Sequence, residues 1–122
     1  MPVHMESTVM QDRPGQLFAA LADPTRRRIV RELAAQGPLT PTALGARTRV
    51  SRQAAAKHLA ALEAVGLAHG NRTGREVRYE LDTAPFAEAE DWMRSIGASL
   101  DRRQAVLKRL IEGSAGGAGE EE

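Results

Sequence analysis

The chain has 122 residues, a formal net charge of +1, 42% hydrophobic and 27% charged residues, and a single Trp, a single Tyr and two Phe. These values predict one globular domain with an aliphatic, mainly helical core. The absence of cysteine excludes disulfides, thiolate metal sites and cysteine nucleophiles, and no apolar run is long enough for a leader peptide or a membrane span. We therefore expect a cytoplasmic protein that is neither exported nor embedded in a membrane.

Charge is unevenly distributed along the chain. Residues 13–78 hold 12 Lys and Arg against 4 acidic residues, a local balance of +8, whereas the remainder holds 5 basic and 12 acidic residues, a balance of −7. A basic middle beside an acidic remainder is typical of a protein that places one face on a polyanion. A charged surface that is merely solvated explains the charge alone equally well.

Two helices are predicted in the first part of the chain. Residues 1–12 are expected to be disordered, and the apolar residues of segment 16–22 predict the first helix. Asp23 is a suitable N-cap and Pro24 a suitable first residue for a second helix, which closes at Gly37.

A helix-turn-helix is predicted next. Thr40 is the expected N-cap of a short helix over 41–47, and Ser51 that of a longer helix over 51–65, which stops at Gly66. A short helix, a tight turn and a second helix form the unit that lays its second helix in the major groove of DNA. The sequence therefore predicts a recognition helix at 51–65.

The period changes from helical to alternating after the recognition helix. Val77, Tyr79 and Leu81 share one face, and turn residues that include Asn71 and Gly74 precede them, which predicts a β-hairpin. Basic residues on such a hairpin suit a wing that touches phosphates or the adjacent minor groove. The basic residues are Arg72, Arg75 and Arg78.

The recognition helix has a polar stripe near its start. With Leu59 at the centre of the buried side, helical geometry places Gln53 and Lys57 on the opposite side among small alanines. Such a stripe can approach base edges closely, and these side chains can bond to adenine or guanine. An Ala-rich surface helix is the alternative if this helix is taken alone, but the basic hairpin that follows favours DNA binding.

The helical pattern returns over 84–112 and forms the longest element. Apolar residues recur every seven positions in two sets, interrupted at Arg103, which is typical of a helix–helix seam. Part of this seam covers its own domain, but its width favours a partner helix. Residues 113–122 cannot pack and are expected to be disordered.

Three segments together resemble a known family. ALADPTRRRIVREL, SRQAAAKHLAALEAVGL and GREVRYEL follow one another as in the arsenic-repressor-like (ArsR) family of winged helix-turn-helix regulators. The resemblance implies a mainly α fold of about five helices and a two-stranded wing, within a domain over 13–112. It also implies a homodimer in which the first and last helices pair and present two recognition helices to a palindromic operator. The interface residues would be Leu17, Phe18, Leu21, Phe86, Met93, Ile96, Leu100, Leu107 and Leu110.

The family's base-contacting positions fall near the start of the recognition helix. Many members have a hydroxyl where this chain has Ala56 and a histidine where it has Lys57, so the operator of other members is not expected to carry over. With the N-cap, the expected DNA-binding residues of this helix are Ser51, Arg52, Gln53, Ala56 and Lys57.

The metal sites of the family are not expected in this chain. They need cysteines, which are absent, or Asp and His on the last helix, and no histidine lies beyond His69. Glu88, Glu90 and Asp91 without an imidazole are a weak set for zinc. We therefore expect a metal-independent regulator without a cofactor, and the sequence identifies no effector ligand.

Two rival functions have less support. An enzyme is not expected, because the chain lacks cysteine, a phosphate-binding glycine loop and a carboxylate pair near a histidine. A winged helix that binds protein instead of DNA would have an acidic or apolar recognition face, and the basic wing argues against it. The sequence therefore predicts a bacterial repressor that binds double-stranded DNA sequence-specifically as a homodimer.

Overall fold

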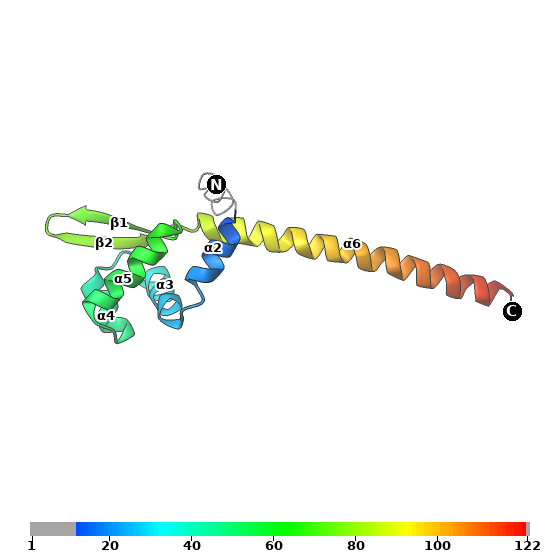
Figure 1. Cartoon of the computed structure of the whole chain (residues 1–122), viewed down its shortest axis with the longest axis horizontal. Coiled ribbons are helices and arrows are strands. Elements are labelled where there is room, and N and C mark those ends of the chain that lie inside the picture. The colour runs from blue at the N-terminus through cyan, green and yellow to red at the C-terminus, as the bar shows by residue number, and fades with distance from the viewer. Residues whose placement is uncertain (1–11, 122) are drawn as a thin grey trace, which may run out of the picture. The chain divides into compact units, whose positions relative to one another are not determined.

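The structure, a computed structural model, describes residues 12–121, with side chains through Gly113. This part of the chain contains five helices and one β-hairpin (Figure 1), which confirms the predicted mainly α fold with a two-stranded wing. The elements in chain order are α2 (Arg13–Ala20), α3 (Pro24–Gln36), α4 (Pro41–Thr48), α5 (Arg52–Ala64), β1 (Ala68–Thr73), β2 (Glu76–Leu81) and α6 (Ala84–Glu121).

Contacts between residues divide the chain into two compact units. The first, here called the winged-helix unit, ends at Ala89, and the second, the helical unit, begins at Glu90. The boundary falls within α6, so the helical unit is a single helix without a core of its own. The domain predicted over 13–112 thus comprises one unit with a core and one without.

The helix starts of the helix-turn-helix region lie where the sequence predicts them. Side-chain oxygens of Asp23, Thr40 and Ser51 accept hydrogen bonds of 2.8–3.2 Å from backbone N–H groups in the first turns of α3, α4 and α5. α3 ends at Gln36 and is capped by Gly37, whose φ of 82° favours glycine. α2 begins earlier than predicted, because Asp12 caps it.

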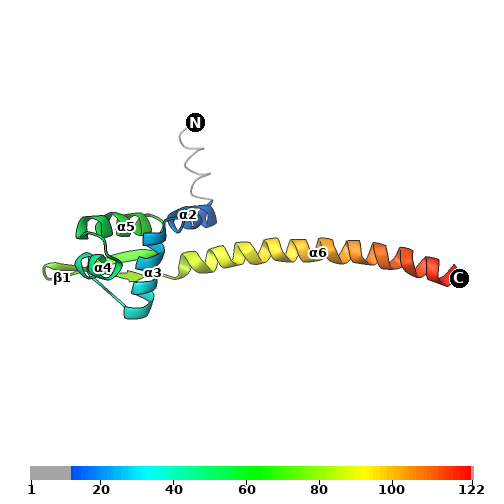
Figure 2. The same cartoon turned by 90° about the horizontal axis from the view of Figure 1, so that it is seen from below.

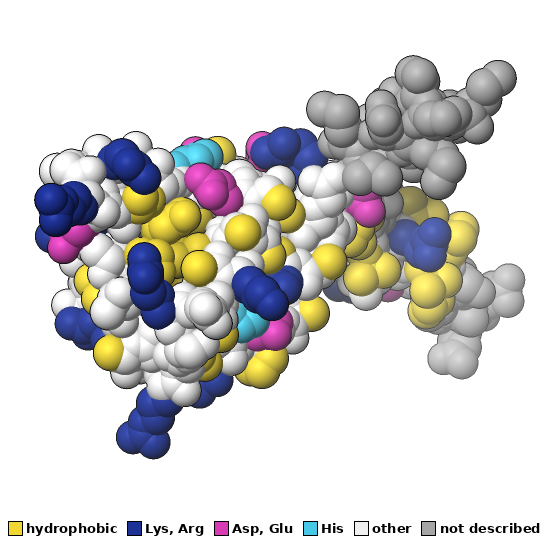
Figure 3. Space-filling model, turned by 60° about the vertical axis from the view of Figure 1, so that its left-hand side comes forward, with side chains coloured by type: hydrophobic (Ala, Val, Ile, Leu, Met, Phe, Trp, Pro, Cys, Tyr) yellow, Lys and Arg dark blue, Asp and Glu magenta, His cyan; other side chains and the backbone are white. Residues whose placement is uncertain are grey.

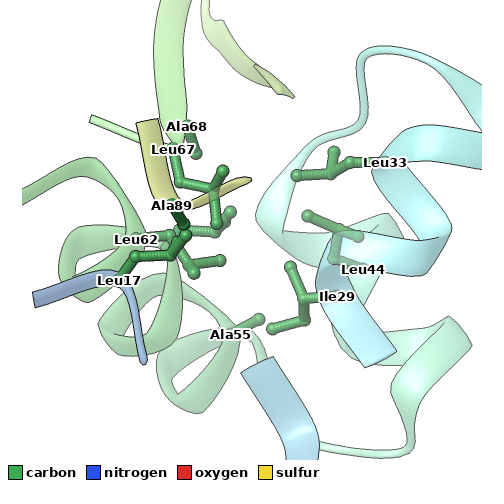
Figure 4. Packing of buried hydrophobic residues seen from close by; sticks show 10 residues of the cluster. Leu17, Ile29, Leu33, Leu44, Ala55, Leu62, Leu67, Ala68 and Ala89 are labelled. Carbon is green, nitrogen blue, oxygen red and sulfur yellow. The ribbon is translucent and has the colours of Figure 1, made fainter. Parts of the chain in front are cut away.

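The core of the winged-helix unit is aliphatic, as the composition predicts, and every helix of the unit contributes to it (Figure 4). α5 packs against α3, α4 and β1 (Figure 2), so the recognition helix is supported along its buried side. The buried cluster consists of Leu17, Ile29, Leu33, Leu44, Ala55, Leu59, Leu62, Leu67, Ala68 and Ala89.

The wing is an antiparallel hairpin in which β1 pairs with β2 along its whole length. Gly74 and Arg75 form a two-residue turn, and Gly74 has the positive φ, 64°, that such turns require. Asn71, which the sequence places among the turn residues, instead lies inside β1 opposite Arg78. A two-residue turn is enough to join the strands, so Asn71 remains in the ladder.

A pair of backbone hydrogen bonds fixes the wing to the helix-turn-helix. The N–H of Tyr79 in β2 donates to the carbonyl of Leu39 at 2.8 Å, and the N–H of Leu39 donates to the carbonyl of Tyr79 at 3.1 Å. Leu39 directly precedes Thr40, the N-cap of α4. The wing and the start of α4 are therefore held side by side.

Helix α6 is longer than the sequence predicts, because it ends at Glu121 and not near Glu112. Extending an existing helix costs far less than starting one, which allows helical backbone to continue into a Gly-rich segment. The disorder predicted over 113–122 stays a prediction. The disorder predicted over 1–12 lies outside the described residues, apart from Asp12.

Candidate nucleic-acid interface

The recognition helix α5 exposes the two side chains that the sequence predicts to read bases. Gln53 and Lys57 lie one helical turn apart, and neither side chain has a hydrogen bond or ion pair within the described residues. The opposite side of α5 is buried through Ala55, Leu59 and Leu62. Both polar side chains are therefore available to an external partner.

A shallow surface hollow of about 470 Å³ lies on the exposed side of α5. Four of the five predicted DNA-binding residues of this helix line it, together with one further alanine. The two alanines keep the surface low, so another molecule can approach the helix backbone closely. The lining residues are Ser51, Gln53, Ala54, Ala56 and Lys57.

The fifth residue, Arg52, is brought together with two arginines of the wing. These three residues line a second hollow of about 480 Å³, formed by the starts of α4 and α5 and by the hairpin. Guanidinium groups around one hollow can bind the oxygens of a phosphate group. We call this feature the arginine hollow, and its lining residues are Thr40, Pro41, Thr42, Arg52, Arg72, Arg75, Glu76, Val77 and Tyr79.

The arginine hollow contains residues that the sequence does not reveal. Thr40 has an evident role only as an N-cap, and Thr42 and Tyr79 carry no signal for this site. They line the hollow because the backbone bridge between Leu39 and Tyr79 holds the wing against the start of α4. No local pattern marks that bridge.

Arg78, the third predicted wing residue, does not line the arginine hollow. Its guanidinium pairs with Glu76 on the same strand at 3.2 Å, and both side chains are more than half exposed. Exposed ion pairs of this kind contribute little to stability. Arg78 can therefore leave Glu76 and pair with an external anion. Figure 3 shows one face of the winged-helix unit, on which Lys and Arg side chains are spread and acidic ones are fewer.

Three residues that the sequence predicts at a dimer interface are used by the winged-helix unit itself. Leu17 is only 2% exposed, and Leu21 and Phe86 are partly buried against the same core. α2 has only eight residues, and its apolar side is needed to cover its own unit. Phe18 is 42% exposed and keeps the most accessible surface of the predicted α2 residues.

The helical unit exposes the remaining predicted interface residues. So many large apolar side chains exposed on one helix mark an interaction surface and not an ordinary solvent-facing one. No helix in the described part is both long and apolar enough to cross a bilayer. The exposed side chains are Trp92, Met93, Ile96, Leu100, Val106, Leu107, Leu110 and Ile111.

The acidic residues considered as metal ligands are engaged in ion pairs. Glu88 pairs with Arg13, and Arg94 pairs with both Glu90 and Asp91. Over residues 12–113, no three His, Cys, Asp or Glu side chains are grouped so that they could hold a metal ion. Metal independence stays a prediction.

Two histidines of the winged-helix unit bond to neighbouring side chains. His58 Nδ1 accepts a hydrogen bond of 3.3 Å from Arg26 Nε, which joins α5 to the start of α3. A hydrogen bond from the Arg26 backbone N–H lowers the pKa of Asp23 beside this contact. His69 Nε2 lies 3.1 Å from Asp82 Oδ2. The pKa of Asp82 is lowered mainly by a hydrogen bond from the backbone N–H of Ala84 in α6, and to a smaller extent by His69.

Comparison with known proteins places this geometry among regulators of transcription. The helix-turn-helix domain family matches residues 21–71. A solved structure of an ArsR-like transcriptional regulator from Rhodococcus sp. RHA1 is 40% identical, covers 83% of this chain and 94% of that chain, and superposes with a TM-score of 0.74.

Two further similarities are more distant. The transcriptional repressor SdpR of Bacillus subtilis is 29% identical over 77 residues, which is 63% of this chain and 84% of the repressor. A homodimeric winged helix-turn-helix DNA-binding domain from Mycobacterium bovis is 22% identical, with a TM-score of 0.57 over 80% of this chain and 87% of that chain. This last similarity supports the fold alone.

Proposed function

Because the chain belongs to the ArsR-like family of winged helix-turn-helix transcriptional regulators, we propose that it binds a specific DNA operator as a homodimer and represses transcription. The observation that carries this proposal is the exposed side of α5, where Gln53 and Lys57 have no partner within the described residues. As a member of a family of DNA-binding regulators, the chain is not an enzyme, as its sequence predicts. Its proposed place of action is the bacterial cytoplasm.

Gln53 and Lys57 have the role of base readers in this proposal. A glutamine amide can pair with adenine through two hydrogen bonds, and a lysine ammonium donates to the guanine acceptors of the major groove. Ala56, which lines the same hollow, leaves room for the base edges. Ser51 caps α5 and so fixes the position from which both side chains extend.

The arginine hollow has the role of a phosphate site. Guanidinium groups bind phosphate oxygens through charge-assisted, often paired hydrogen bonds, and Arg52, Arg72 and Arg75 surround one space. Phosphate contacts fix the register of a protein on DNA but carry no direct sequence information. Arg52 thus belongs with the wing and not with the base readers, and Arg78 contacts a neighbouring phosphate.

A homodimer is supported by the exposed apolar side chains of the helical unit and by Phe18. A second copy of the same helix would cover them and create a two-fold axis. Two recognition helices related in this way read two half-sites of a palindrome, spaced by about 10–10.5 base pairs or a multiple of this. The relative from M. bovis is described as homodimeric, and SdpR as a repressor.

The alternative function is a winged helix that binds a protein and not DNA. It is disfavoured because the exposed side of α5 and the wing carry basic and amide side chains instead of acidic or apolar ones. Salt dependence separates the two functions. A DNA-binding dimer with roughly 6–10 phosphate contacts loses about 10³–10⁵-fold in affinity between 50 and 200 mM salt.

Mutation separates base reading from phosphate contact. We expect Gln53→Ala or Lys57→Ala to weaken operator binding by about 1–3 kcal/mol with little change on random DNA, because only the operator offers the bases that these side chains recognise. Arg75→Ala weakens binding to both DNAs. The measurement is equilibrium binding to fragments selected from the host genome and to random duplexes.

The matched control is Gln36→Ala, which removes the same amide from an exposed position at the end of α3. This variant should bind both DNAs like the unmodified protein. Equal losses on operator and random DNA for Gln53→Ala, Lys57→Ala and Arg75→Ala would contradict the assigned roles.

A further inference from the structure

The winged-helix unit carries another group of arginines, outside the interface described above. Arg27, Arg28 and Arg31 of α3, together with Pro24, line a surface hollow of about 390 Å³. All three arginines are exposed, and they lie on the side of α3 opposite its buried residues. We call these three residues the α3 arginine stripe.

Within the described residues, no acidic side chain forms an ion pair with the α3 arginine stripe. Several other exposed arginines of the chain pair with glutamates. Arg27 and Arg31 are four residues apart, and like charges at this spacing destabilise a helix. A cluster of like charge that its own fold does not compensate is typical of a surface for a negatively charged partner.

Two guanidinium groups of the stripe are held in place by local hydrogen bonds. Arg27 Nη1 donates to the backbone carbonyl of Leu21 at 2.6 Å, and Arg28 Nη2 donates to Thr25 Oγ1 at 3.0 Å. A guanidinium has five N–H donors, so each group keeps donors for a ligand. The four-residue step from Arg27 to Arg31 is roughly 6 Å along the helix, close to the rise of about two nucleotides on one DNA strand.

The residue that precedes the stripe contacts the recognition helix. Arg26, which directly precedes Arg27, donates from Nε to His58 Nδ1 of α5 at 3.3 Å. His58 directly follows Lys57, one of the proposed base readers. The packing of α3 against α5 (Figure 2) therefore keeps the residue before the stripe in contact with the recognition helix.

We propose that the α3 arginine stripe is a second phosphate-binding surface, which contacts the DNA backbone outside the base pairs that α5 reads. This proposal rests on the proposed function. DNA is favoured over an acidic protein because the stripe belongs to the same basic stretch of sequence, residues 13–78, as the arginines of the arginine hollow. Contacts of this kind raise affinity for every sequence and lengthen the DNA segment that the protein covers.

The test removes two charges from the stripe with Arg27→Gln/Arg31→Gln. The matched control, Arg102→Gln/Arg109→Gln, removes the same charge from exposed positions of the helical unit that have no ion pair in the described part. Affinity is measured against salt concentration on two operator duplexes, one trimmed to its half-sites and one extended by a helical turn at each end.

On the extended duplex, we expect the slope of log affinity against log salt to become less steep by about 0.9 for each phosphate that the variant no longer neutralises. The slope on the trimmed duplex, and both slopes of the control variant, should stay as in the unmodified protein. Arg27→Lys/Arg31→Lys keeps the charges and should restore most of the slope, which distinguishes the removal of charge from a disturbed fold.

An unchanged slope of the Gln variant on the extended duplex would overturn the proposal, and weaker retention of the Gln variant than of the unmodified protein on poly-glutamate would then assign the stripe to an acidic protein. An equal loss on both duplexes would overturn its placement outside the base-read segment. Gln53→Ala is measured in parallel. If this variant binds the operator normally, the result counts against the proposed function and not against the stripe.

Discussion

At the scale of single residues, Arg49 has the most unusual backbone conformation in the described part. It follows α4 with φ 60° and ψ 39°, and it is the one residue other than glycine with a positive φ among residues 12–121. The left-handed conformation ends α4 and turns the chain toward Ser51. A residue with a side chain pays about 1–2 kcal/mol for it.

Replacement of Arg49 by two small residues measures this strain. We expect Arg49→Gly to be more stable than Arg49→Ala by about 1 kcal/mol, because both remove the same arginine side chain and only glycine adopts the left-handed region freely. Denaturant unfolding of the two variants gives the difference. Equal free energies of unfolding would show that the turn adapts to a side chain without strain.

At the scale of elements, the helix-turn-helix depends on a close approach of two backbone segments. A Cβ on Gly45 of α4 would lie 2.8 Å from the carbonyl oxygen of Val50, and the Val50 N–H donates to the Gly45 carbonyl at 2.9 Å. The obstacle is backbone, so it cannot rotate away as a side chain would. Gly45 therefore sets how closely the turn before α5 packs on α4.

A methyl group at Gly45 should open this turn. We expect Gly45→Ala to lower the free energy of unfolding by about 1–3 kcal/mol, as other overpacked sites do, and to weaken operator binding because the start of α5 shifts. Gly97→Ala is the control, because a Cβ there meets open space. Thermal unfolding and DNA affinity are measured for both, and a Gly45 variant as stable as the control would refute the close-contact argument.

The elements also divide what the sequence predicts from what it does not. The caps at Asp23, Thr40 and Ser51 were predictable because the side chain and the N–H groups that it satisfies are only two or three residues apart. The bridge from Leu39 to Tyr79 joins residues far apart in the chain, so the arginine hollow that depends on it could not be predicted.

The burial of Leu17 could not be predicted for a related reason. A hydrophobic stripe on a short helix indicates that one side is covered, but not whether its own unit or a second chain covers it. The structure places Leu17 in the core of its own unit. The DNA-binding roles of Gln53 and Lys57 stay predictions, although the exposure that these roles require was predicted correctly.

At the scale of the whole molecule, only one of the two units has a core. The helical unit exposes Leu100 by 49% and Leu110 by 67%, and it is a single helix in which neighbouring turns cannot cover one another. Association of two such helices would bury these apolar side chains, which is favourable because it removes apolar surface from water. Apart from Phe18, the residues that support the proposed homodimer therefore lie in a part of the chain that is distinct from the DNA-reading part.

A charge in the middle of the exposed seam should separate the two copies. We expect Leu100→Asp to sediment as a monomer or a much weaker dimer, because a carboxylate buried at the interface costs several kcal/mol. Helical circular dichroism should be largely retained, and operator binding should fall to the level of random DNA, because a monomer reads only one half-site.

The control for this change is Ala98→Asp, which adds the same charge to α6 at an exposed position off the seven-residue seam. It should remain a dimer and bind the operator normally. If Leu100→Asp also stays a tight dimer, or if its monomer binds the full operator with unchanged affinity, the seam is not the dimer interface.

The division into two units also separates the aromatic chromophores of the chain. Its one tryptophan, Trp92, lies in the helical unit and is 48% exposed, whereas its one tyrosine, Tyr79, lines the arginine hollow. Tryptophan absorbs at longer wavelengths than tyrosine, so its selective excitation reports on the solvent around the helical unit and leaves the tyrosine of the wing unexcited. Self-association can thus be followed by tryptophan emission in the unlabelled protein.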